Sequence, residues 1–236
     1  GNEVPAIMAN DNITINGVGV LEANNGIKVA DDKTVTIKLN GKESELKADV
    51  LVSEGIVEID LANGTWNGNN DGAATIKGGG WTGDNTGEAT LENGEWSGDN
   101  LTTGTAIIEG GKWSGDNIGK VTLNKGTWEG INKGDANVTE VDWNKDNAGT
   151  VEINKGSWNG NNTGTATLTD VEWEGNNKNK VIVNNGSWVG SNESAGEATL
   201  SGGEWTGDNS GTVKMNGGTW SGNNEAQGNA TIEGGT

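Results

Sequence analysis

The chain has 236 residues, of which 42 are glycine and 11 are tryptophan, and it contains no Cys, His, Arg, Tyr or Phe. These absences exclude a disulfide framework, a thiol nucleophile, a Ser-His-Asp triad, a Cys/His zinc site and a bidentate arginine clamp for phosphate. The net charge of -19 disfavours binding to nucleic acid and insertion into anionic membranes, and no run approaches the ~20 apolar residues of a membrane span.

The first fifty residues lack the repeat that fills the rest of the chain. Strand-like runs stand at residues 13–15, 18–21 and 34–39. Residues 41–50 are compatible with a short helix or with a turn-bearing rung. Because repeat proteins need a terminal unit that shields the first repeat, we expect residues 1–50 to form a divergent, β-rich N-terminal cap.

The repeat register can be followed backwards from the first tryptophan. Leu51 stands fifteen residues before Trp66, so we expect Leu51 to replace tryptophan in the preceding rung. Three aliphatic residues follow it at the Gly, Ala and Leu positions of the repeat, namely Val57, Ile59 and Leu61. The repeat region is therefore predicted to span residues 51–236.

A tryptophan recurs every 15 residues, with two intervals of 17. The tryptophans are Trp66, Trp81, Trp96, Trp113, Trp128, Trp143, Trp158, Trp173, Trp188, Trp205 and Trp220. An asparagine stands four residues after each of them: Asn70, Asn85, Asn100, Asn117, Asn132, Asn147, Asn162, Asn177, Asn192, Asn209 and Asn224. Glycine stands two residues after every tryptophan except Trp143, which Lys145 follows. The unit is W-x-G-x-N-x-G-x-[AV]-x-[ILVM]-x-x-G-x.

Residue character alternates with period two within this unit. Trp, Gly, Asn and the aliphatic residues share one parity, and Thr, Ser, Asp, Glu and Lys share the other, which is typical of a β-strand. The parity slips before each Trp, which indicates one turn. The Gly-Asn-x-Gly stretch is expected to form the other turn, because Gly and Asn readily take positive φ. Two short strands per unit predict an all-β fold, a parallel β-solenoid (β-helix) with rungs of about 15 residues stacked at ~4.8 Å.

A rung of 30 residues is the alternative, since the small position alternates between Ala and Val from Ala106 onward. A 15-residue rung makes Lys125, Glu140, Lys155 and Asp170 vertical neighbours of alternating sign, whereas a 30-residue rung stacks like charges. Opposite charges on neighbouring strands are favourable and like charges are not. The charge pattern therefore favours the 15-residue rung.

The tryptophans and asparagines are predicted to be structural. The residues beside each Trp are polar, as in Thr65/Asn67 and Glu95/Ser97, and neighbours in a strand face opposite ways. Trp and the aliphatic residues should therefore form the core, and the asparagines an amide ladder like those of cross-β structures. The competing interpretation is an exposed Trp row that stacks against sugar rings.

No catalytic, cofactor-binding or metal-ligating residue is predicted. Carboxylates are plentiful, but no two are singled out as an acid/base pair. The Gly-Asp-Asn turns at residues 83–85, 98–100, 115–117 and 207–209 suggest weak calcium binding at most. An interrupted row of threonines is the feature that would suit an ice-binding surface. The row contains Thr75, Thr90, Thr122, Thr167, Thr199 and Thr231.

The chain finishes within a rung. Residues 230–236 follow the repeat, and Thr236 stands one residue before the next Trp position. An unshielded rung is an unpaired strand edge that invites another chain. We expect either a piece of a longer repetitive protein or a homo-oligomer that assembles head to tail, the open C-terminal rung of one copy against the N-terminal cap of the next.

The W-x-G-x-N-x-G-x-A run resembles the repeats of bacterial extracellular β-solenoids, namely adhesins and autotransporter passengers, and more loosely curli-type fibre subunits, whose repeats are longer and carry Gln and Ser positions missing here. The resemblance covers residues 51–236. It implies a secreted or cell-surface protein without catalysis, whose signal peptide has been removed. We expect a self-assembling fibre subunit or a rigid surface stalk; a carbohydrate-binding adhesin is the alternative, and an ice-binding solenoid a weaker one.

Overall fold

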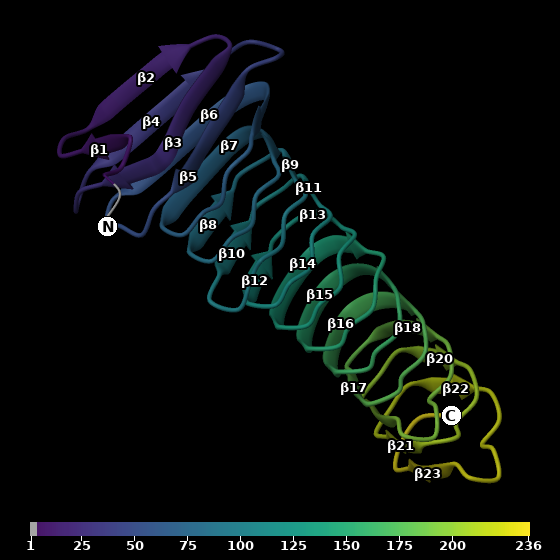
Figure 1. Ribbon diagram of the computed structural model, residues 1–236. Coiled ribbons are helices and arrows are strands. Elements are labelled where there is room, and N and C mark those ends of the chain that lie inside the picture. Colours follow the sequence, from purple (N-terminus) through teal and green to yellow (C-terminus); the bar gives the residue numbers. More distant parts are fainter. Residues whose placement is uncertain (1–3) are drawn as a thin grey trace. The chain divides into compact units, whose positions relative to one another are not determined.

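The computed structural model describes residues 4–236, which form strands and turns and contain no helix. The chain divides into two compact units, Gly1–Thr122 and Leu123–Thr236. Within each unit, successive strands pair in parallel as the rungs of a β-solenoid (Figure 1). The predicted fold class is confirmed.

The first unit contains strands β1 to β11 and most of β12. Their bounds are β1 Ile7–Ala9, β2 Ile13–Gly17, β3 Val20–Val29, β4 Thr34–Leu39, β5 Glu45–Val50, β6 Ile56–Trp66, β7 Ala73–Trp81, β8 Glu88–Leu91, β9 Glu95–Trp96, β10 Thr105–Ile108, β11 Lys112–Trp113 and β12 Lys120–Leu123.

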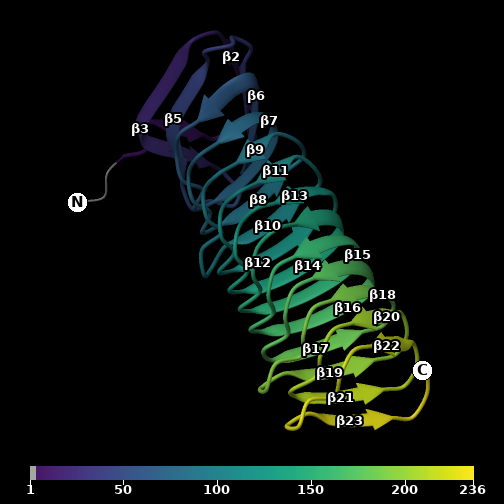
Figure 2. The same ribbon diagram turned by 90° about the vertical axis from the view of Figure 1, so that its right-hand side faces the viewer.

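The second unit contains strands β13 to β23. Their bounds are β13 Gly126–Trp128, β14 Asp135–Trp143, β15 Thr150–Asn159, β16 Thr165–Glu174, β17 Lys180–Val183, β18 Gly186–Val189, β19 Glu197–Leu200, β20 Glu204–Thr206, β21 Thr212–Met215, β22 Thr219–Ser221 and β23 Asn229–Ile232. Figure 2 shows β18, β20 and β22 side by side in this unit.

Strands β1 to β5 also stack in parallel, but with wider rungs than the repeat. Ile7 pairs with Ile27 and Val20 pairs with Glu45. Residues 41–50, for which helix and rung were both open, supply the strand β5. Strands β1 to β5 therefore form parallel rungs of their own, and the 15-residue period does not extend into them because their rungs are longer.

Three register assignments before Trp66, those of Leu51, Val57 and Ile59, are wrong. The residue paired with Trp66 in the preceding rung is Leu46, not Leu51. Val57 pairs with Ala74 and so takes the small position instead of the Gly position, and Ile59 pairs with Ile76. The reason is that the rung before Trp66 is 20 residues long, so a count of fifteen residues back from Trp66 stops short of Leu46.

From Trp66 onward, the 15-residue rung is confirmed. In the second unit Trp143 pairs with Trp158, and Trp158 with Trp173. Electrostatics favoured this rung, but within the described residues Glu140, Lys155 and Asp170 form no ion pair. They share a backbone conformation instead, with φ of 53°, 64° and 55°. The alternating charges at these positions are therefore not paired as the electrostatic argument expected.

The chain bends on both sides of each repeat asparagine, where the second turn was expected, but the asparagines do not make that turn through positive φ. No asparagine among the described residues has positive φ; those that do, apart from glycine, are Asp32, Ala62, Glu140, Lys155 and Asp170. Within each unit, successive repeat asparagines instead form parallel bridges, as Asn147 does to Asn162. Each regular rung thus has two strands and, in addition, one isolated bridge at its asparagine. The backbone is extended at this asparagine, which turns the amide side chain inward.

Burial follows the predicted parity. In β16, Ala166, Leu168 and Trp173 are buried, while Glu172 and Glu174 are exposed. Val171 is buried as well and adds an extra core residue where most rungs have glycine. The interior is therefore filled by one indole, two or three aliphatic side chains and one amide from each rung.

Candidate functional site

The tryptophan side chains form a face-to-face stack in each unit, here called the indole column. In the second unit the ring centroids of neighbouring tryptophans from Trp128 to Trp220 lie 4.6–5.0 Å apart with interplanar angles of 7–10°. In the first unit the values from Trp66 to Trp113 are 4.5–4.8 Å and 7–10°. Every ring is at most 1% exposed except that of Trp220, which is half-buried. An exposed tryptophan row is therefore excluded.

Each indole N–H is used to join its rung to the previous one. The Nε1 of Trp158 donates to the carbonyl oxygen of Lys145 at 2.8 Å, and that of Trp173 donates to Gly160 at 2.8 Å. Within each unit, the acceptor is the residue two positions after the preceding tryptophan, and Trp66, which has no preceding tryptophan, uses Ala48 at 2.7 Å. These buried donors are thus satisfied within the backbone and are not offered to a ligand.

This hydrogen bond explains the glycine two residues after tryptophan. A Cβ at Gly160 would lie 2.1 Å from the Lys145 carbonyl oxygen and 2.9 Å from the Trp158 Nε1. At Gly98 the distance to the carbonyl oxygen of Gly83 would be 1.9 Å. The glycine is required by close approach of two backbones, a role that the spacing alone did not reveal.

The asparagines form the predicted amide ladder. From Asn70 to Asn117 in the first unit and from Asn132 to Asn224 in the second, the Nδ2 of one asparagine donates to the Oδ1 of the next at 2.7–2.8 Å, as from Asn147 to Asn162. The same Nδ2 also lies near backbone carbonyls; that of Asn147 is 3.1 Å from the Gly149 and Thr165 oxygens. Ladder members from Asn70 to Asn209 are fully buried, and Asn224 is exposed. The ladder from Asn70 to Asn209 therefore belongs to the core.

The ladder has a direction, and its acceptor end is unsatisfied. The Oδ1 of Asn70 is buried without a hydrogen-bond partner in the described part of the chain. Its neighbour in the preceding rung is Val50, whose side chain has no donor and whose backbone N–H is donated to the carbonyl oxygen of Asn69 at 2.8 Å. A one-way chain of amides always leaves one acceptor unused at its start, so this atom marks where the ladder begins.

Outward-facing carboxylates and amides make a second set of links between rungs. The Oδ1 of Asp84 accepts the backbone N–H of Asp99 at 2.9 Å, and Asp99 accepts that of Asp116 at 2.8 Å. This row of like charges is therefore used for hydrogen bonding between rungs. The described residues contain no group of three or more Asp, Glu, His or Cys side chains that is suited to a metal ion.

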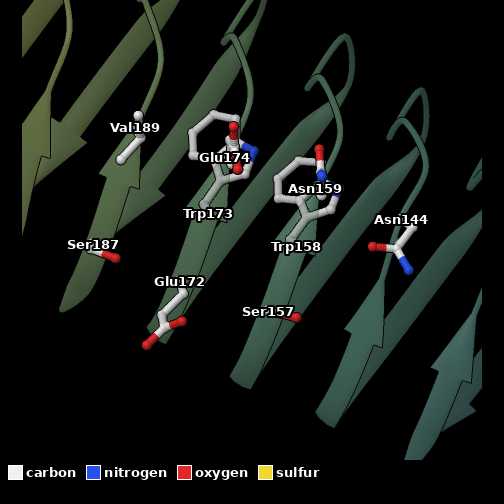
Figure 3. A pocket seen from close by; sticks show the side chains of 9 residues that line it. All are labelled: Asn144, Ser157, Trp158, Asn159, Glu172, Trp173, Glu174, Ser187 and Val189. Atoms are coloured by element: carbon white, nitrogen blue, oxygen red, sulfur yellow. The ribbon is translucent and has the colours of Figure 1, made fainter.

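A shallow groove of about 360 Å³ lies on the outer face of the second unit (Figure 3). Its floor lies over Trp158 and Trp173, and two rows of side chains cross strands β15, β16 and β18 above them. The rows contain Ser157, Glu172 and Ser187, and Asn144, Asn159, Glu174 and Val189. These residues stand immediately before and after the tryptophans, and sequence reasoning assigned them no role beyond solvation.

Comparisons with protein-family models, with curated proteins and with solved structures find no match. In residues 4–236 no helix has the length and apolar character that a membrane span requires. The features on which a function can rest are therefore the β-solenoid itself, its indole column and its amide ladder.

Proposed function

We propose that this chain is a non-enzymatic, extracellular structural protein that acts as a self-assembling fibre subunit or as a rigid surface stalk. The observation that carries the proposal is that every residue type fixed by the repeat is used inside. Tryptophan, asparagine and glycine serve packing and hydrogen bonding between rungs. The residue types at the outward-facing positions differ from rung to rung, as is typical of a solvent-exposed surface.

The pairing between rungs supports assembly. Backbone hydrogen bonds, stacked indoles and amide links repeat from rung to rung with the same geometry, as between Trp143, Trp158 and Trp173. Rungs from two copies can join by the same contacts, which would give a head-to-tail, heterologous interface and an open filament. In the described chain β2 pairs with β4 on one side only and exposes Ile13.

Electron microscopy and sedimentation over a range of concentrations test the proposal. Filaments whose mass grows with concentration support the fibre subunit, and unassociated elongated particles support the stalk. Compact particles would contradict both. Ile13→Lys should weaken association, whereas Ile107→Lys should not, because Ile107 has a similar exposure (39% against 37%) but lies within the stacked rungs.

A carbohydrate-binding adhesin is the second candidate, and the groove over Trp158 and Trp173 favours it. Its rim offers hydroxyl, amide and carboxylate groups in a regular array, which suits the hydroxyl groups of a glycan. Calorimetric titration with neutral oligosaccharides tests this candidate. Glu172→Gln with Glu174→Gln should reduce binding, and Glu152→Gln, which exchanges an exposed carboxylate on β15 outside the groove, should leave it unchanged.

A further inference from the structure

We infer that the indole column of the second unit conducts one-electron oxidation equivalents along the solenoid axis. The inference does not depend on the proposed function, since the column is present in a stalk, a fibre or an adhesin. It rests on the stacking geometry, on the hydrogen bonds of the indoles and on the residues that the chain lacks.

The stacking geometry gives electronic contact between successive rings. From Trp128 to Trp220, neighbouring centroids are 4.6–5.0 Å apart and nearly parallel. Aromatic pairs usually adopt offset or edge-to-face arrangements at 4.5–7 Å. The backbone ladder holds these rings at the short end of that range. Electron exchange falls steeply with separation, so short steps between rings are far faster than one long step.

The hydrogen bonds favour movement of the electron without movement of the proton. The Nε1–H of Trp143, Trp158 and Trp173 is donated to a backbone carbonyl at 2.8–2.9 Å. A carbonyl oxygen is a hydrogen-bond acceptor but a very weak base. An oxidised indole in the column therefore keeps its proton as a radical cation, and the next transfer needs no proton to return.

The composition removes the usual traps. The chain contains no Tyr and no Cys, the side chains that most readily capture an oxidising equivalent from tryptophan. The rings are at most 1% exposed from Trp128 to Trp205, which shields a radical from water and solutes. The net charge of -19 favours a cation inside the molecule.

The electron balance of each step is simple. A bound one-electron oxidant of the ruthenium(III) polypyridyl class takes one electron from Trp220 and becomes ruthenium(II), leaving an indole radical cation. Trp205 then gives one electron to oxidised Trp220, and the exchange repeats from ring to ring until Trp128 is oxidised. In the variant Thr127→Tyr, the introduced phenol beside Trp128 returns the last electron and releases its proton to the buffer, which leaves a tyrosyl radical.

The experiment uses the full chain, in which an introduced thiol and an introduced phenol are each unique. Ser221→Cys, beside Trp220, carries the ruthenium complex, and Thr127→Tyr, beside Trp128, is the trap. A laser flash with hexaammineruthenium(III) as quencher generates the oxidant. Transient absorption should show rapid formation of the tyrosyl radical at the far end. Absence of that radical would overturn the inference.

Two variants separate conduction from folding. Trp173→Phe keeps an aromatic ring in the stack, but the ruthenium(III) complex cannot oxidise a phenylalanine ring. Most of the distal tyrosyl signal should therefore be lost. Val171→Ala removes a buried contact from the same strand, β16, and leaves every indole in place, so the signal should persist. Circular dichroism confirms that both fold. An equal signal in Trp173→Phe and the parent would also overturn the inference, since the column would then not be the path.

Discussion

The Nε1 of Trp158 donates a hydrogen bond of 2.8 Å to the carbonyl oxygen of Lys145, which lies in the preceding rung and follows Trp143 by two residues. The same contact recurs between other rungs, with glycine at the acceptor position. It couples the indole column to the backbone, so that ring stacking and close backbone approach depend on each other.

The first prediction concerns this close approach. Gly160→Ala should destabilise the second unit by about 1–3 kcal/mol, the usual cost of forcing extra atoms into a packed core, because the new Cβ would lie 2.1 Å from the Lys145 carbonyl oxygen. Chemical denaturation measures the change. Gly78→Ala is the matched control, because its Cβ would meet nothing nearer than 3.9 Å. Equal effects of the two substitutions would remove the steric explanation.

The second prediction concerns the indole column. Trp143 stacks on Trp128 at 4.7 Å and on Trp158 at 5.0 Å. Trp143→Ala should therefore cost about 3–5 kcal/mol, as for other buried tryptophans. Trp220→Ala should cost less, since Trp220 is half-buried and stacks on Trp205. Thermal melting compares the two variants, and an unchanged melting temperature for Trp143→Ala would contradict a structural role for the column.

The third prediction concerns the amide ladder. Asn147→Leu removes the donor to Asn162 Oδ1 and the acceptor for Asn132 Nδ2. Buried polar groups left without a partner cost about 1–3 kcal/mol each, so the variant should be strongly destabilised although leucine is similar in size.

Asn159→Ala is the control for the ladder, because Asn159 is exposed and lies outside it. A surface substitution of this kind usually changes stability by less than about 0.5 kcal/mol. Urea denaturation of both variants measures the difference, and the ladder would lose its assigned role if Asn147→Leu were as stable as Asn159→Ala.

The fourth prediction is spectroscopic. Because the tryptophans from Trp66 to Trp205 are at most 1% exposed, their fluorescence should be blue-shifted and resistant to aqueous quenchers. The near-parallel rings should also give an excitonic signal in near-ultraviolet circular dichroism. Oligosaccharides should leave the emission unchanged. Red-shifted, easily quenched emission would show that the rings lie in water.

The sequence by itself determined the repeat and what it places inside. Alternation of period two assigned Trp158 and Asn162 to the same inward face, and a fixed spacing of fifteen residues predicted that each stacks on its copy in the next rung. These conclusions follow from local geometry, because side-chain direction in a strand depends only on parity.

The tertiary structure decided what depends on contact between rungs. The pairing of Leu46 with Trp66 depends on the lengths of the turns, which the sequence alone does not reveal. The turns before Trp66 are longer, so the fifteen-residue spacing does not hold there. The bridging role of the asparagines and the closeness of Gly160 to Lys145 depend on how two backbones approach. Parity gives the direction of a side chain, but only the stacked neighbour supplies the partner that it meets.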